Sequence, residues 1–205
     1  MGLFLESICV ISKGVINLKI ALFGKMRSGK DTVGKFLVDQ FNFQRLAFGD
    51  EIGTVIETYF PEAFKDGKPR HHYQFIGQRF RELDQDVWVK KVLQKVIYEE
   101  SMGEILNYGP LNFVITDGRQ LNEAEKMREA GFLIVKVECD EDLRIERIKA
   151  SGDNFNPEQL QHETELQVDM IQPDYVIKND GTLEALHIQV MKLVETLVGG
   201  VNECE

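Results

Sequence analysis

The chain has 205 residues, enough for one domain with a sizeable core, and its apolar (43%) and charged (28%) fractions are ordinary for a globular protein. A net charge of −10 excludes a protein that wraps a nucleic-acid duplex, because such a protein needs a basic face. No apolar stretch approaches the ~20 residues that span a bilayer, so we expect neither nucleic acid nor a membrane as partner.

Residues 1–16 are an N-terminal extension to which the sequence assigns no role. They are apolar at their start but contain Glu6 and lack a basic beginning, which makes a poor signal peptide. The three cysteines are widely spaced without a C-x-x-C pair, as is typical of reduced thiols. We therefore expect a cytoplasmic protein whose main domain covers residues 17–205.

A predicted strand, a glycine-rich loop and a predicted helix follow one another from Leu18. Residues 18–23 form an apolar run typical of a buried strand, and apolar residues recur at helical spacing from 33 to 41. The loop between them, Gly24-Lys-Met-Arg-Ser-Gly-Lys30, matches G-x-x-x-x-G-K. Such a loop turns N–H groups toward a phosphate at a helix N-terminus, and its lysine reaches the terminal phosphates. The residues expected to bind nucleotide here are Gly24, Lys25, Arg27, Ser28, Gly29, Lys30, Asp31 and Thr32.

The position after Lys30 departs from the commonest form of this loop. Asp31 stands where Ser or Thr is usual, and the hydroxyl comes one place later at Thr32. An aspartate repels a bound triphosphate unless it points away or helps to hold Mg²⁺, so Asp31 and Thr32 are candidate metal ligands. The Gly-Lys-x-Thr form resembles nucleotide kinases such as adenylate kinase.

The next region carries a polar helical stripe. Asp50 is predicted to be the N-cap of a helix over about 51–59, and Trp88 is expected in the core. A polar stripe with one small residue and one arginine suits a planar ligand that carries a phosphate, and it equally fits a solvated helix face with Arg–Glu pairs. The residues of the stripe are Gln74, Gly77, Gln78 and Arg81.

A second buried strand is predicted over 111–116, and Asp117-Gly-Arg119 follows it. Ligands of an open parallel sheet lie at the carboxyl ends of its strands. There Asp117 can order Mg²⁺ or its waters, and Arg119 can clamp a phosphate oxygen.

Helices and strands continue to alternate after Arg119. The pattern predicts a helix over 121–130, a strand over 132–137, a last short strand over 172–178 and a final helix over 183–198. Buried strands that alternate with helices imply a parallel sheet covered on both faces.

Asp140 is predicted to cap a helix on which Arg144 and Arg147 lie three residues apart. Since both face one way just before residues 150–157, they resemble the rim of a closing flap. Guanidinium groups there can stabilise the charge of a transferring phosphoryl group. The alternative is pairing within the helix, with Asp140, Glu141 and Glu146.

Together these segments resemble the deoxynucleoside monophosphate kinases of bacteriophages, over residues 18–198. The likeness rests on the loop Gly24–Thr32, on Trp88-Val-Lys90, on Asp117-x-Arg119-Gln120 and on Asn179-Asp-Gly-Thr-Leu-Glu184. The last motif also looks like that of dephospho-coenzyme A kinases. Animal phosphomevalonate kinases share the Ser-Gly-Lys-Asp loop and the Asp-x-Arg segment.

The resemblance implies an α/β P-loop kinase fold, with three layers (α/β/α) around a five-stranded parallel sheet, an acceptor-binding segment at about 46–85 and a lid at about 144–165. It implies ATP and Mg²⁺ as cofactors and small-molecule nucleotides as substrates. Asp117 would lie near the metal and Arg119 would touch phosphate. The adenine would be bordered by Asn179, Asp180 and Gly181. The acceptor would be bound by Asp50, Gln74, Gln78, Arg79 and Arg81.

We therefore expect in-line transfer of the γ-phosphate of ATP to a (deoxy)nucleoside monophosphate. Acceptors like phosphomevalonate or dephospho-coenzyme A are the near alternative, and a non-catalytic P-loop switch is the distant one. Arginines in the lid and acceptor segments favour a kinase, because a switch normally borrows its arginine or carries it in its switch loop. The sequence does not determine the oligomeric state, and a homodimer is compatible with it. The expected catalytic residues are Lys30, Asp117, Arg119, Arg144 and Arg147.

Overall fold

The computed structural model describes residues 17–65, 67–150 and 163–202. The N-terminal extension and residues 151–162, the greater part of the expected lid, lie outside the described residues. Within the described part of the chain, no helix is both long enough and apolar enough to cross a membrane.

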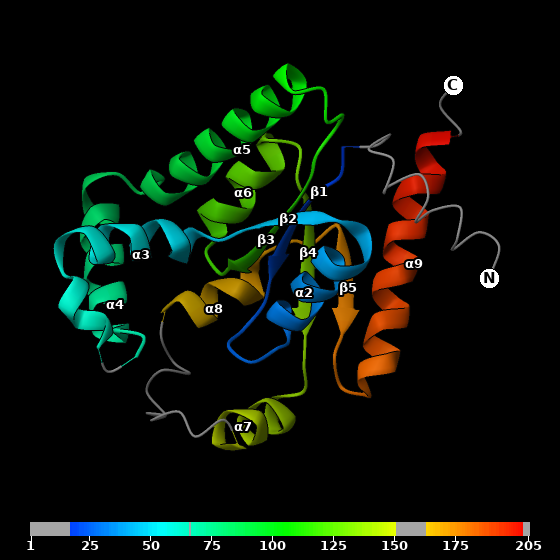
Figure 1. The fold of residues 1–205 in the computed structure, drawn as a ribbon. Coiled ribbons are helices and arrows are strands. Elements are labelled where there is room, and N and C mark those ends of the chain that lie inside the picture. The colour runs from blue at the N-terminus through cyan, green and yellow to red at the C-terminus, as the bar shows by residue number, and fades with distance from the viewer. Residues whose placement is uncertain (1–16, 66, 151–162, 203–205) are drawn as a thin grey trace.

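Five strands form one sheet in which all neighbours are parallel, in the order β2-β3-β1-β4-β5 (Figure 1). The central position of β1 follows from its sequence, since four of its five residues are buried. The five-stranded parallel sheet expected from the resemblance is confirmed. The strands are β1 (Lys19–Phe23), β2 (Phe43–Leu46), β3 (Asn112–Gly118), β4 (Leu133–Glu138) and β5 (Tyr175–Lys178).

Helices cover both faces of the sheet, as the side chains of β1 require. Ile20 and Leu22 pack on one face, under α2 (Lys30–Phe41) and α9 (Leu183–Asn202). Ala21 and Phe23 pack on the other face. This alternation gives the three-layer α/β/α arrangement that the sequence predicts. The helices on the second face are α5 (Val87–Ile105) and α6 (Leu121–Glu129).

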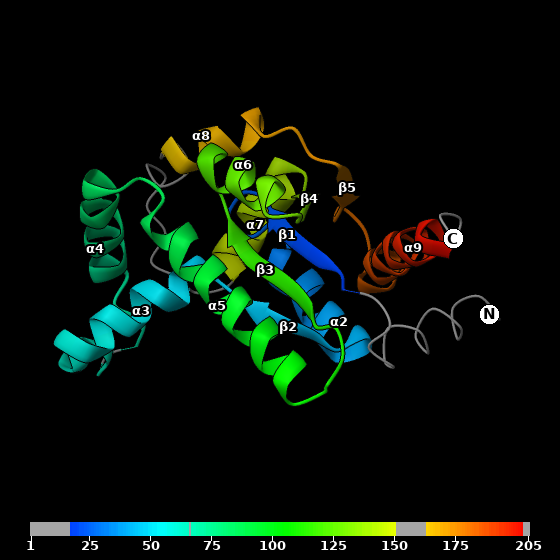
Figure 2. The same cartoon turned by 90° about the horizontal axis from the view of Figure 1, so that it is seen from above.

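Two helices and a short 3₁₀ turn project to one side of the sheet (Figures 1 and 2). Trp88, at the start of α5, is buried, and its indole N–H donates to the carbonyl of Gly77 at 3.1 Å. The predicted core position of Trp88 is confirmed, and its hydrogen bond ties the projecting part to α5. The projecting elements are α3 (Phe48–Tyr59), η1 (Pro61–Phe64) and α4 (Arg70–Leu83).

The strands point toward α7 (Glu141–Ala150), so this helix lies at their carboxyl ends (Figure 1). Asp140 begins it as predicted, because its Oδ1 accepts the N–H groups of Asp142 and Leu143. The other helix near this edge is α8 (Glu163–Met170), which follows the undescribed residues.

The predicted N-cap at Asp50 is wrong. Helix α3 already begins at Phe48, so Asp50 lies within its first turn, where it pairs with Arg45 at 2.8 Å. The N–H groups of Phe48 and Gly49 donate instead to the carboxylate of Asp117, at 2.9 and 2.8 Å. A cap supplied from the end of β3 replaced the local one, which allowed the helix to start earlier.

Candidate active site

The loop between β1 and α2 passes so close to other backbone that two of its positions require glycine. Gly29 has a φ of +104°, and a Cβ placed on it would lie 2.1 Å from Nδ2 of Asn179. A Cβ on Gly24 would lie 2.5 Å from the carbonyl oxygen of Val137. The two glycines of the motif therefore shape a tight loop against the ends of β4 and β5.

Lys30 folds back over this loop. Its side chain is buried, and its Nζ donates to the carbonyl oxygens of Gly24 and Lys25, the latter at 3.0 Å. Next to it, the buried Oγ of Ser28 has no hydrogen-bond partner among the described residues. The structure thus gathers an ammonium group and a hydroxyl without a partner in the loop where the sequence predicts phosphate.

Asn179 connects the loop to the end of β5. Its Nδ2 donates to the carbonyl of Ser28 at 2.9 Å, and its own carbonyl accepts from Arg147 at 3.1 Å. Asp180 accepts the N–H of Asp140 at 2.6 Å, and Gly181 follows, exposed. Asn179 and Asp180 therefore lie beside the loop, as a role at the base of a bound nucleotide requires.

Of the two arginines of α7, Arg144 contacts the loop and Arg147 contacts Asn179 beside it. Arg144 is only 3% exposed and donates to the carbonyl of Met26 at 3.3 Å. It also contacts Glu141, at 3.6 Å, so one of the alternative pairings within the helix is present as well. Arg147 additionally contacts Sγ of Cys139 at 3.1 Å.

A cavity of about 290 Å³ opens beside the loop, at the carboxyl ends of β4 and β5. Of the predicted nucleotide site, it is lined by Lys25, Ser28, Arg144 and Asp180. Asp169 of α8, which sequence reasoning missed, pairs with Lys25 at 2.8 Å. The strand residues of the lining were also missed, although their place at the carboxyl ends of parallel strands is a usable signal. They are Lys136, Val137 and Glu138 of β4 and Lys178 of β5, and Cys139, directly after β4, joins them.

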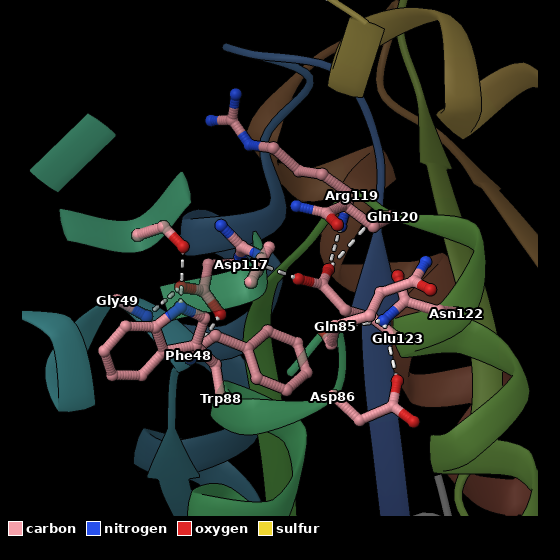
Figure 3. Close-up of polar contacts among 12 residues, drawn as sticks. Phe48, Gly49, Gln85, Asp86, Trp88, Asp117, Arg119, Gln120, Asn122 and Glu123 are labelled. Carbon is pink, nitrogen blue, oxygen red and sulfur yellow. Dashed lines mark hydrogen bonds and ion pairs between the residues drawn. The ribbon is translucent and has the colours of Figure 1, made fainter. Parts of the chain in front are cut away.

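Asp117 uses both carboxylate oxygens on the backbone of α3 (Figure 3). Burial raises its pKa, and the two N–H bonds oppose that rise. The other proposed metal ligands, Asp31 and Thr32, are exposed on the first turn of α2. Among the described residues no group of three or more His, Cys, Asp or Glu side chains is placed to hold a metal ion. A Mg²⁺ held by one or two protein oxygens plus phosphates needs no such group.

A buried carboxylate that the sequence did not single out lies at the start of α6. Oε2 of Glu123 accepts the N–H groups of Arg119 and Gln120, both at 3.0 Å, and Oε1 lies 3.3 Å from Nη2 of Arg81 (Figure 3). Burial raises its pKa, against the pull of these bonds. The guanidinium of Arg119 points away from Glu123 (Figure 3). A Glu three residues after a helix N-cap was the available signal.

The other predicted acceptor residues are dispersed. Gln74 and Gln78 are exposed on α4. Arg79 pairs with Glu82 at 2.7 Å, which is the Arg–Glu pairing of the alternative interpretation. Arg81, also on α4, differs from them because it reaches Glu123 at the start of α6.

The sequence matches a known protein family over most of its length. Residues 20–166 match a family model described as an AAA domain. No curated protein matches the sequence.

Solved structures resemble this chain over nearly its whole length. One is an unliganded sugar kinase from Janibacter sp. HTCC2649, at 15% identity and a TM-score of 0.54, covering 86% of this chain and 94% of that one. Another is shikimate kinase from Acinetobacter baumannii in complex with shikimate, at 18% identity and a TM-score of 0.53, covering 97% of this chain and 99% of that one. A third is a gluconokinase from Sinorhizobium meliloti 1021, at 16% identity and a TM-score of 0.54, covering 90% of this chain and 95% of that one. At these identities the likeness establishes the fold, which is that of P-loop kinases.

Proposed function

Because the chain belongs to the AAA-domain family and has a P-loop kinase fold, we propose that it transfers the γ-phosphate of ATP to a (deoxy)nucleoside monophosphate. One observation carries the proposal: the glycine loop with Lys30 and the guanidinium of Arg81 both lie at carboxyl ends of the central strands. The loop follows β1, and Arg81 is bonded to Glu123 at the start of α6, the helix that follows β3, the strand that pairs with β1. A phosphate donor and a charged acceptor can meet at such an edge.

The donor side has the chemistry that a triphosphate needs. Lys30 would exchange its two loop carbonyls for phosphate oxygens, and the Oγ of Ser28 would gain the partner it lacks. The cavity bordered by Asp180 would take the nucleoside. When bound, Mg²⁺ would offset phosphate charge, and Asp31, Thr32 and Asp117 are the residues proposed to hold it.

The reaction asks little covalent work of the protein. An acceptor phosphate is already anionic, so no strong general base is needed, and catalysis consists of aligning two anionic ligands while cations offset their repulsion. Arg119 is the arginine proposed to touch the phosphates, since its guanidinium points away from Glu123 (Figure 3). Arg144 and Arg147 would act from the lid side, where they already contact the loop and Asn179.

Charge supports the choice of a phosphorylated acceptor. The solved neighbours are named for shikimate, gluconate and sugars, which favours a small-molecule acceptor in general. Arg81, held by Glu123 beyond the end of β3, favours an acceptor that already carries a phosphate. Among such acceptors, the motifs Asp117-x-Arg119 and Asn179-Asp-Gly support a nucleotide, with phosphomevalonate and dephospho-coenzyme A as the compounds to compare.

A coupled assay for ADP tests the proposal. With ATP and Mg²⁺ present, we expect ADP release to depend on dAMP, dCMP, dGMP, dTMP or AMP. Release with phosphomevalonate, dephospho-coenzyme A, shikimate or gluconate alone would contradict the acceptor assignment. Slow release that ignores every acceptor would point to a nucleotide switch. The variant Lys30→Ala should lower the rate by about 10²-fold or more if its ammonium acts on the phosphates.

A further inference from the structure

We propose that Glu123 is a positioning residue for the acceptor site, which it serves by orienting the guanidinium of Arg81. The inference rests on the proposed function, in which Arg81 meets the phosphate of the acceptor. Glu123 itself touches no substrate in this proposal, because its side chain is only 4% exposed and its oxygens are occupied.

The guanidinium of Arg81 is held along one edge. Nη2 lies 3.3 Å from Oε1 of Glu123. In the amide orientation that turns its oxygen toward these donors, Gln120 accepts from Nε at 3.1 Å and from Nη2 at 3.3 Å. Because the guanidinium is planar and rigid, bonds to two of its nitrogens determine where the third points.

The third nitrogen, Nη1, lies beside Gly77 of the same helix. It has no acceptor among the residues that the structure describes. Gly77, one turn earlier on α4, gives it room, since a Cβ there would lie 3.3 Å from it. An arginine that is held along one edge and keeps a donor without an acceptor on the other is suited to bind an anion such as a phosphate.

The carboxylate also links two parts of the molecule. Its Oε2 binds the N–H groups of Arg119 and Gln120 after β3, while its Oε1 binds Arg81 from the projecting helix α4 (Figure 3). One side chain thus sets the position of Arg81 relative to the turn that carries Arg119. Loss of the negative charge should therefore weaken binding of the acceptor and leave binding of ATP unchanged.

The chain offers a variant that separates orientation from capping. Glu123→Asp keeps a carboxylate that can accept the N–H groups of the turn but is one methylene too short to reach Arg81 as well. Glu123→Gln puts an amide NH₂ against either Arg81 or the backbone donors. Asn122→Ala is the matched control, because Asn122 lies on the same turn but binds Gln85 and Asp86 of the α5 start, at 3.3 and 3.0 Å.

The experiment measures KM for ATP and for whichever of dAMP, dCMP, dGMP and dTMP the wild type uses fastest. We expect Glu123→Gln and Glu123→Asp to raise the KM of the monophosphate about tenfold or more, with the KM of ATP within about twofold. Asn122→Ala should leave both constants near wild type. Thermal unfolding checks that each variant is folded.

A double-mutant cycle with Arg81→Ala distinguishes an effect of Glu123 through Arg81 from a general effect of Glu123 on the structure. If Glu123 acts through Arg81, adding Glu123→Gln to Arg81→Ala changes the KM of the monophosphate no further. Additive effects, or an unchanged KM in both Glu123 variants of an active enzyme, would overturn this inference alone. A wild type that transfers phosphate to none of the four monophosphates would overturn the proposed function, and the inference with it.

Discussion

Gly29, in the candidate site, has a backbone conformation that favours glycine. Its left-handed φ of +104° costs any other residue energy, and a side chain there would displace the Asn179 amide that binds the carbonyl of Ser28. The sequence predicted that this glycine matters, because the G-x-x-x-x-G-K pattern is local. It did not predict why, since Asn179 lies 151 residues beyond Ser28.

Gly29→Ala should therefore lower the free energy of unfolding by about 2 kcal/mol or more and weaken ATP binding. Gly131→Ala is the matched control, because Gly131 also has a positive φ (+81°) but open space where the Cβ would lie. Its cost should be nearer 1 kcal/mol. Urea unfolding measures both values, and equal losses in the two variants would contradict the role given to Asn179.

Glu123 should also leave a signature in the pH dependence of stability. Burial raises its pKa in the folded protein above the ordinary value of 4.5, so the folded state binds more protons than the unfolded state above about pH 4. Stability due to this group is then lost as the pH rises toward the folded pKa. The unfolding free energy of wild type minus that of Glu123→Gln should fall from pH 4 upward, by at most about 1.4 kcal/mol per pH unit. Urea unfolding across pH 4 to 7 measures this difference, and a rise with pH would contradict it.

Helix α3 shows how an element can be predicted while its beginning is not. The helix was expected over about 51–59, and it spans Phe48–Tyr59. Its cap comes from Asp117, 69 residues beyond Phe48, so local sequence at Asp50 could not reveal it. The apolar runs of β1, β3 and β4 were visible because a strand buried on both faces needs no distant partner to be recognised.

Removal of this cap should destabilise the projecting part of the molecule. Asp117→Ala leaves the N–H groups of Phe48 and Gly49 without their acceptor and should cost about 1–2 kcal/mol. Asp50→Ala, which removes only an exposed pair with Arg45, should cost about 0.5 kcal/mol or less. Denaturant unfolding measures the loss of stability in each variant. A larger loss in Asp50→Ala than in Asp117→Ala would show that Asp50, and not Asp117, caps the helix.

On the scale of the whole molecule, the sequence predicts a parallel sheet covered on both faces, and the resemblance supplies its five strands. The strand order β2-β3-β1-β4-β5 places the glycine loop, which follows β1, between the end of β3 that carries Asp117 and the end of β5 that Asn179 follows. No local pattern contains that order. The loop was predicted residue by residue because its pattern is local, whereas the contacts of Glu123 with Arg81 and of Asp169 with Lys25, which join distant segments, were missed.

The central claim is that the loop Gly24–Lys30 binds a nucleoside triphosphate, and titration calorimetry with ATP and Mg²⁺ tests it most directly. Wild type should give a saturable heat of binding. Lys30→Ala should bind at least about tenfold more weakly. Lys35→Ala should match wild type, because Lys35 lies exposed on the same helix, paired with Asp39. A folded wild type that gives no heat with ATP, or a Lys30→Ala variant that binds as wild type does, would contradict the claim.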